Sequence, residues 1–218
     1  MILLTGYYRD SDERRAGELR ECLRRNSGNP AISGLVVFVE DGTAAADVTA
    51  VVEEVHRGKV RLVEHGRRVT YEGLFSFAAA LPHRQRFVIA NADIYFDTTL
   101  NLLDGVELAN RLLCLSRWDV QPDGTSVFFD HPSSQDAWIF ETPLPRFACR
   151  FHLGLPGCDN RLAWEAAAVG IELSNPSRTI RAHHLHLSHV HHAGERDRLH
   201  GPTRDVPAGH LDDITTQA

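Results

Sequence analysis

The sequence predicts an α/β protein whose central sheet is mainly parallel and carries helices on both faces. Strand-like and helix-like segments alternate over the first hundred residues, which is the order of right-handed βαβ units. The strand-like segments are short apolar runs that end abruptly in polar residues. Polar clusters follow three of these runs, and sheets of this kind bind ligands at the carboxyl ends of their strands. A ligand site is therefore expected at one rim of the sheet.

Each element of the first half has its own local signal. In the segment after the first strand, Ala16, Leu19, Cys22 and Leu23 recur at three- and four-residue spacing, which predicts a helix with one buried face. Thr70 fits the N-cap of a later helix. The expected strands are 2–4, 34–40, 59–64 and 87–90, and the expected helices are 13–25, 47–56 and 70–80.

The second half is less regular. A strand over 112–116 leads into Arg117, Trp118 and Asp119, and a second apolar run follows at 134–140. A glycine-rich stretch then brings Asp159 to the start of a helix, where it is expected as the N-cap. Residues 194–218 are polar and rich in proline and glycine, which predicts a flexible tail behind a domain of residues 1–193.

The segment 86–100, RFVIANADIYFDTTL, carries the first candidate metal ligands. Asn91 and Asp93 are two residues apart, so in an extended chain they share one face at the end of a buried strand. A carboxylate and an amide at one edge suit a hard divalent cation that keeps positions open for phosphate oxygens. The alternative is that both residues only form the turn that closes the strand. Asp97 is not placed by this pattern.

A histidine-rich segment, IRAHHLHLSHV at 180–190, supplies further candidates. Its alternation predicts a strand with His184, His186 and Ser188 on one face and Leu185 and Leu187 on the other. Together with Asp93, these imidazoles predict a mixed carboxylate and imidazole metal site. The alternative is an exposed cluster without a ligand, which fits His189, His191 and His192 better than the alternating pair.

Composition limits the class of protein. The 218 residues carry a formal net charge of −6, which weighs against nucleic-acid binding but not against a nucleotide ligand. The four cysteines form no CxxC pair, so reduced thiols are expected. The N-terminus has no basic region ahead of an apolar one, and no apolar run is long enough to span a bilayer. These features predict a cytoplasmic protein without an integral membrane segment.

Four motifs occur in an order that resembles a known family: NADIYFD, SQDAWIF, LPGCDNRLAWE and RAHHLHLS. Over roughly residues 1–190, the chain resembles the GT-A fold glycosyltransferases, in particular the compact single-domain members of algal viruses, plants and bacteria. The resemblance implies a GT-A-like sheet with an irregular, acceptor-side second half. It also implies a hexosyltransferase that uses Mn²⁺ or Mg²⁺ and a nucleoside-diphosphate sugar, a UDP-sugar being favoured, with a glycan or glycoconjugate as acceptor.

The resemblance also implies roles for individual residues. Asn91 to Asp93 resembles the family's DxD motif with its first Asp replaced, so Asp93 would bind the metal and Asn91 the nucleotide ribose. The late histidine of the metal shell maps to His186 or His184. Asp159 maps to the acid near the acceptor, which removes the acceptor proton in inverting members, and Asp136 would contact the donor sugar. The residues expected to hold the nucleotide are Thr5, Tyr7, Tyr8, Arg9, Arg67 and Thr70.

Some choices stay open at this point. One tyrosine of Tyr7 and Tyr8 would stack on the base, and Arg67 and Arg68 would face the diphosphate or solvent. Trp118 and Asp119 would hold a sugar or belong to the core. A nucleotidyltransferase needs a glycine-rich loop that carries a lysine, whereas Lys59 is the only lysine here. A catalytically silent binding module is permitted by Asn91, and the scaffold supports both inversion and retention.

Overall fold

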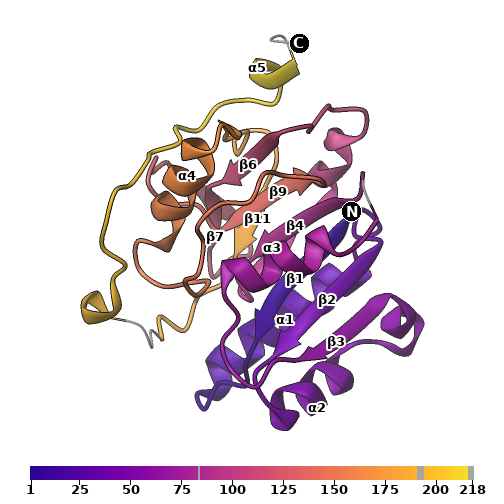
Figure 1. The fold of residues 1–218 in the computed structure, drawn as a ribbon. Coiled ribbons are helices and arrows are strands. Elements are labelled where there is room, and N and C mark those ends of the chain that lie inside the picture. Colours follow the sequence, from indigo (N-terminus) through magenta and orange to yellow (C-terminus); the bar gives the residue numbers. More distant parts are fainter. Residues whose placement is uncertain (83, 191–193, 216–218) are drawn as a thin grey trace.

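The computed structural model describes residues 1–82, 84–190 and 194–215, and its central layer is a seven-stranded, mostly parallel sheet (Figure 1). The strand order is β10-β6-β9-β4-β1-β2-β3, and β9 runs antiparallel to both of its neighbours. This arrangement confirms the predicted fold class. The strands are β1 (Ile2–Tyr7), β2 (Gly34–Val39), β3 (Val60–Glu64), β4 (Arg86–Ala90), β6 (Arg111–Leu115), β9 (Ala137–Glu141) and β10 (Glu172–Ser174).

Helices cover both faces of this sheet, and each face has its own apolar core. On one face lie α1 (Glu13–Gly28) and α2 (Gly42–Val51). On the other lie α3 (Tyr71–Ala79) and α4 (Cys158–Ala168). The Thr70 side chain accepts a hydrogen bond from the Gly73 backbone N–H, which confirms it as the N-cap of α3. The short helices are η1 (Glu54–Lys59), η2 (Thr98–Leu103), η3 (Glu195–Asp197) and α5 (Asp212–Thr215).

A second, four-stranded sheet packs on the α1 side. Its order is β5-β11-β7-β8, with β5 at Ile94–Phe96, β7 at Arg117–Val120, β8 at Ser126–Phe128 and β11 at Ala182–His184. Asn26 of α1 ties it to the helix by donating to the Ile94 carbonyl (2.8 Å) and accepting from the Phe96 N–H (3.1 Å). The strand expected over 180–190 is therefore much shorter, and His186 and Ser188 lie beyond its end.

The C-terminal residues differ from the flexible tail expected from their composition. The yellow segment in Figure 1 runs along the outside of the molecule past α4 to α5. Val206, Leu211 and Ile214 are buried, and the Val206 backbone N–H donates to the Pro132 carbonyl at 2.8 Å. Three apolar residues at irregular spacing give no periodic signal, but each fills a gap on the surface of the domain. Docking of this kind holds an otherwise polar segment in place.

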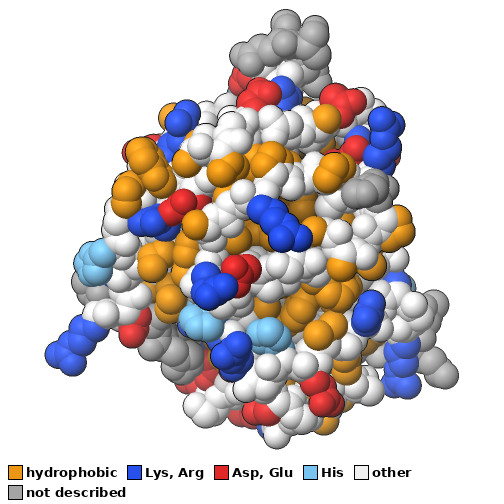
Figure 2. All heavy atoms as spheres, in the orientation of Figure 1, with side chains coloured by type: hydrophobic (Ala, Val, Ile, Leu, Met, Phe, Trp, Pro, Cys, Tyr) orange, Lys and Arg blue, Asp and Glu red, His pale blue; other side chains and the backbone are white. Residues whose placement is uncertain are grey.

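The surface and the helices fit two of the composition arguments. Figure 2 shows basic and acidic side chains interspersed on the face in view, without a continuous basic stripe. Among the helices of the described residues, none combines the length and the apolar character needed to cross a bilayer.

Candidate functional site

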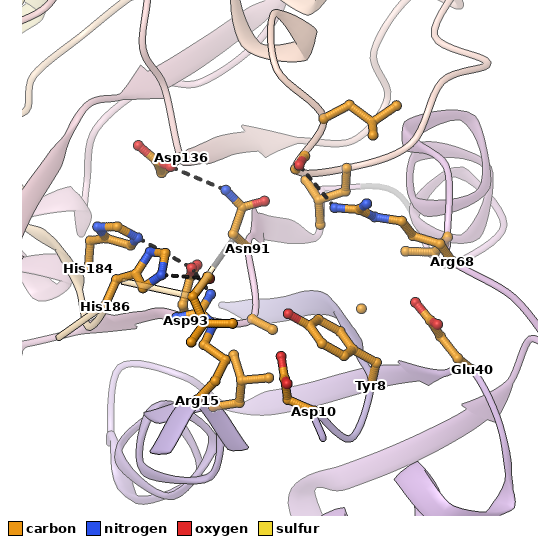
Figure 3. A pocket seen from close by; sticks show the side chains of 18 of the residues that line it. Tyr8, Asp10, Arg15, Glu40, Arg68, Asn91, Asp93, Asp136, His184 and His186 are labelled. Atoms are coloured by element: carbon orange, nitrogen blue, oxygen red, sulfur yellow. Dashed lines mark hydrogen bonds and ion pairs between the residues drawn. The ribbon is translucent and has the colours of Figure 1, made fainter. Parts of the chain in front are cut away.

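A cavity of about 670 Å³ opens at the carboxyl ends of β1 and β4 (Figure 3). The antiparallel strand β9 supplies a third wall, because its first residue, Ala137, pairs with Ala90 at the end of β4. Asp136, which precedes β9, therefore lies next to Asn91, which follows β4. Asn91 donates a hydrogen bond through Nδ2 to Asp136 Oδ1 at 3.2 Å. Two motifs that are 45 positions apart in sequence thus meet at one rim, as ligand binding by a parallel sheet requires.

Three potential metal ligands gather on one side of this cavity. One ligand atom from each of Asp93, His184 and His186 lies within 4.8 Å of the others. The second sheet produces this convergence, since β11 pairs antiparallel with β5 and the Leu185 N–H donates to the Asp93 carbonyl at 2.9 Å. Of the three residues expected on one face, His184 and His186 line the cavity and Ser188 does not, while His183 stacks on Tyr95.

Hydrogen bonds to the outer nitrogens orient both imidazoles. His184 Nδ1 lies 2.8 Å from Asp119 Oδ1, and its Nε2 lies 3.3 Å from Asp93 Oδ2. His186 Nε2 lies 2.9 Å from the Val190 carbonyl, which can only accept, so Nε2 carries the proton and Nδ1 keeps the lone pair. A carboxylate or carbonyl behind each ligating histidine is the usual support of a metal site. One carboxylate and two imidazoles fit a divalent transition-metal cation such as Mn²⁺.

Positive groups surround the carboxylate of Asp93. Burial opposes ionisation of Asp93, but His184 and then Arg15 outweigh it and hold the pKa of Asp93 well below its usual range. Burial likewise disfavours protonated His184, yet the Asp93 carboxylate and the hydrogen bonds to Asp119 and Asp93 raise the pKa of His184 to about 10. The group is therefore built around one ionised carboxylate that several positive groups share.

Asp119 offers a test of this arrangement. Replacing Asp119 by alanine removes the acceptor behind His184, so the affinity of the protein for Mn²⁺ is expected to fall about 10- to 100-fold. Asp123→Ala is the matched control, because Asp123 lies in the turn between β7 and β8 and accepts from Thr125. Equal Mn²⁺ affinity in the two variants would show that Asp119 does not support the ligand.

The far side of the cavity has an aromatic ring and charged side chains. Tyr8 lies between Asp10 and Glu40 in Figure 3, and Arg68 lies above them. Arg68 donates through Nη2 to the Gly154 carbonyl at 3.0 Å and so bridges two loops of the rim. The φ of Gly154 is +72°, in the left-handed region, and a Cβ on this residue would lie 2.8 Å from that nitrogen, so only glycine fits without strain.

Two further carboxylates, Asp136 and Asp159, line the same cavity. Burial raises the pKa of Asp159 well above its ordinary value, and the charge of Asp136 raises it further. Burial also raises the pKa of Asp136, against the opposing effect of Arg117, whose Nη1 lies 3.5 Å from Asp136 Oδ2. A carboxyl group with a raised pKa can exchange a proton near neutral pH.

Asp159 is not the N-cap that its position in the sequence predicted. The cap of α4 is Gly157, with φ at +78°, and Asp159 lies within the first turn of the helix. Its Oδ1 accepts a hydrogen bond from Cys158 Sγ at 3.2 Å. Because Gly157 caps the helix, α4 begins at Cys158, two residues before the expected start at Asn160. The Asp159 carboxylate therefore lines the cavity and does not cap the helix.

Comparison with known proteins agrees with this architecture. No family model matches the chain, and no curated protein matches its sequence. Among solved structures, a mannosyltransferase from Pyrobaculum calidifontis in complex with GDP-Man and Mn²⁺ superposes with a TM-score of 0.53 at 13% identity, over 85% of this chain and 56% of that one. The chain has a GT-A-like fold. The chain spans little more than half the length of that mannosyltransferase. At 13% identity the similarity concerns the fold alone.

Two other solved structures superpose less closely on the GT-A-like chain. A 4-diphosphocytidyl-2C-methyl-D-erythritol synthase from Anaerococcus prevotii has a TM-score of 0.44 at 13% identity and covers 90% of this chain and 94% of that one. A second synthase of that name has a TM-score of 0.42 at 17% identity, with the same coverage.

The GT-A-like fold brings most of the sequence-predicted site residues into the cavity and leaves four outside its lining. Those that line it are Tyr8, Arg9, Asn91, Asp93, Asp136, Asp159, His184 and His186, joined by Arg68. The four outside the lining are Thr5, Tyr7, Arg67 and Thr70. Thr5 donates to the Ala90 carbonyl (2.9 Å), the Tyr7 hydroxyl donates to Asp47 (2.6 Å), Arg67 is exposed, and Thr70 caps α3.

The structure also shows where Trp118 and Asp119 lie. Trp118 donates to the Ser177 carbonyl at 2.9 Å and packs on Phe128, away from the cavity lining. Asp119 Oδ1 lies 2.8 Å from His184 Nδ1, and Asp119 does not line the cavity. His191 and His192 lie outside the described residues.

Sequence reasoning missed several residues that line the cavity, namely Asp10, Arg15, Glu40 and Arg117. A signal existed for Arg15, because it stands four residues before Leu19 and seven before Cys22, on the buried stripe of α1. A charged residue on an apolar stripe is worth examining as a buried ion pair. No comparable pattern marks Glu40, whose place at the rim depends on the length of β2.

Proposed function

We propose that this protein is a metal-dependent glycosyltransferase that moves a sugar from a nucleoside-diphosphate sugar to a hydroxyl of a glycan, protein or small acceptor. The observation that carries the proposal is the convergence of Asp93, His184 and His186 at the strand ends of a GT-A-like sheet, in a cavity that also contains Asp159. The mannosyltransferase of the same fold is in complex with GDP-Man and Mn²⁺, which supports this choice of donor class.

Asp93, His184 and His186 would hold the cation, and the nucleotide would extend from them toward Tyr8. When bound, a divalent cation supplies Lewis-acid stabilisation of the diphosphate leaving group. Tyr8 offers a ring for the base, and Arg9 and Arg68 offer positive charge along the same wall. Asn91 lies next to the metal ligands, and its amide is held by Asp136.

Asp159 is the residue placed to take the acceptor proton. It lies at the start of α4, on the wall that the glycine-rich loop closes. Its raised pKa makes the carboxylate more basic than an exposed aspartate, which favours removal of a proton from a sugar hydroxyl as the new bond forms. Asp136, between Asn91 and Arg117, is placed to contact the donor sugar.

The only lysine of the sequence supports sugar transfer over nucleotidyl transfer. Lys59 donates through Nζ to the Asn29 carbonyl (2.9 Å) and to the Ile32 carbonyl (3.0 Å). Its ammonium group is therefore bound to backbone carbonyls at the end of η1, directly before β3. It does not line the cavity. A lysine that cradles the phosphates of a nucleoside triphosphate is thus missing from the described lining residues.

A donor panel tests the proposed function. Purified protein is incubated with Mn²⁺ and a series of UDP-, GDP-, CDP- and TDP-sugars, and release of nucleoside diphosphate is measured with and without a mixture of sugar acceptors. We expect slow, Mn²⁺-dependent hydrolysis of one donor class that EDTA abolishes and that an acceptor accelerates. Release of pyrophosphate from a nucleoside triphosphate and a sugar phosphate, with no hydrolysis of any sugar donor, would instead identify a nucleotidyltransferase.

A further inference from the structure

One continuous surface is formed by α3, β3, the connection 65–70 between them and the loop 144–152. The loop runs beside the start of α3, because the Tyr71 N–H donates to the Phe151 carbonyl at 3.0 Å. On the other side of the helix, the Arg61 guanidinium of β3 lies 5.2 Å from the centre of the Phe77 ring. We call this surface the α3 face, and it is on the side of the sheet that Figures 1 and 2 show in front.

The α3 face is positively charged, although the whole chain carries a formal net charge of −6. Arg150 pairs with Glu72 at 3.0 Å. Glu64 lies on the opposite side of the sheet, because its strand partner Val39 belongs to the other core. Within the described residues, the other arginines of the face are exposed and form no ion pair, namely Arg61, Arg67, Arg68 and Arg146. The segments that form this face therefore place five arginines on it against one carboxylate.

Half-buried aromatic rings lie among these arginines. Phe75 packs on Phe147 with 5.0 Å between the ring centres, and on Phe140 of the core at 4.9 Å. The rings are thus anchored in the core on one side and reach solvent on the other. Figure 2 shows hydrophobic side chains between separate basic ones over the middle of this face. Four of the ten phenylalanines of the chain are half-buried here, namely Phe75, Phe77, Phe147 and Phe151.

Unpaired arginines around half-buried rings are complementary to the surface of an anionic bilayer. Each arginine near such a surface is attracted by the lipid phosphates, and apolar groups between the arginines enter the headgroup region. A single-stranded nucleic acid fits less well, because it needs rings whose flat faces are open to its bases. Here Arg61 lies over the ring of Phe77, and Phe75 is held between Phe140 and Phe147.

We propose that the α3 face docks on an anionic membrane surface. Arg68 belongs both to this face and to the lining of the cavity, and Phe151 is two residues from Leu153, which also lines the cavity. Docking through the α3 face therefore brings this rim of the cavity to the lipid headgroups. The inference rests on the charge and the apolar groups of the surface, so it is independent of the proposed glycosyltransferase activity.

Co-sedimentation with lipid vesicles tests the docking. The protein is mixed at low salt with vesicles of phosphatidylcholine alone, or with vesicles in which about a third of the lipid is phosphatidylglycerol. We expect binding to the anionic vesicles only, and we expect it to weaken strongly in about 1 M salt, where the Debye length is about 3 Å. In the double variant Arg61→Glu, Arg146→Glu, partitioning is expected to fall at least about tenfold, since each basic residue at an anionic surface contributes about fivefold.

The double variant Arg14→Glu, Arg24→Glu is the matched control. Both arginines are exposed on α1, on the other side of the sheet, and their reversal changes the net charge by the same amount. Its partitioning is expected to stay within about twofold of the wild type, because these charges lie away from the docked surface. Circular dichroism melting curves establish that each variant is folded. If the Arg61 and Arg146 variant does not fold, the single change Arg67→Glu repeats the test, with an expected loss of at least about fivefold.

Binding to anionic vesicles that is lost on reversal of Arg61 and Arg146 but kept by the control supports the proposal. No binding by the wild type, equal binding to both kinds of vesicle, or equal loss in the two double variants contradicts it. Salt-sensitive binding of a single-stranded RNA, or a salt-sensitive dimer in sedimentation velocity, without vesicle binding, would assign the α3 face to nucleic acid or to a second copy of the chain. The donor panel is measured without lipid, so its result stands apart from each of these outcomes.

Discussion

Replacing Asp93 by asparagine is expected to abolish metal-dependent nucleotide binding. Asp93 is the only carboxylate in the Asp93, His184 and His186 group, so its loss leaves two imidazoles beside the positive charge of Arg15. Since loss of an outer-shell partner alone commonly costs 10- to 100-fold in affinity, loss of this ligand is expected to cost at least about 100-fold. Calorimetry with GDP and UDP, with and without Mn²⁺, measures the effect.

Asp97→Asn is the matched control for this experiment. Asp97 lies four residues further along the chain, where it accepts from the Thr99 N–H at 2.9 Å and contacts His183 Nε2 at 3.1 Å, outside the metal group. Asparagine is preferred to alanine at position 93 because its carbonyl still accepts a hydrogen bond from Arg15, which would otherwise be left as a buried cation with fewer partners. Unchanged Mn²⁺-dependent binding in folded Asp93→Asn would remove Asp93 from the metal site.

The sequence was sufficient for the residues that lie at or just beyond the ends of the strands that reach the cavity. Asn91, Asp93, His184 and His186 were all expected on one rim, and all four line the cavity. Asn91 and Asp93 follow β4 in a turn and His186 follows the end of β11, so the meeting of strand ends placed them and not the alternation of side chains. The parts of the site that depend on strand ends could be read without coordinates.

Residues that depend on element length or on tertiary contacts could not be read in this way. The first strand continues to Tyr7, three residues beyond its expected end, so Thr5 and Tyr7 lie within the sheet, whereas Tyr8 and Arg9 reach the cavity. Asp119 acts on His184 through a strand pairing between β7 and β11 that joins segments 65 residues apart. No local pattern records such a pairing, because each strand is only three or four residues long.

Buried charge was the other feature that the local pattern concealed. Glu18 reads as an ordinary polar position of a surface helix, and Arg15 stands out only as a charge on the apolar stripe, but both are buried against residues 185–188. Their burial depends on the second sheet, which covers the part of α1 that a single-sheet reading leaves in solvent. The consequence is functional, since the same contacts that dock α1 also place a positive charge on the metal ligand.

Asp159→Asn is expected to lower the rate of sugar transfer about 100- to 10,000-fold, the usual contribution of a general base, while donor and Mn²⁺ binding stay within about twofold of the wild type. The amide keeps the shape of the side chain in the first turn of α4 but cannot take a proton. Transfer is measured with the donor and acceptor found in the panel, and binding by calorimetry. Glu165→Gln is the matched control, because Glu165 lies on the same helix and pairs with Arg161.

The pH dependence of transfer gives a second reading of the same residue. Burial and the charge of Asp136 raise the pKa of Asp159, so the fraction of the basic carboxylate form grows as pH increases through that raised value. The wild-type transfer rate is therefore expected to rise with pH over this range, and the rise is expected to be absent from the residual activity of Asp159→Asn. Full turnover by the asparagine variant, or an identical pH profile in both proteins, would assign the removal of the acceptor proton to another group, of which Asp136 is the nearest candidate by its own raised pKa.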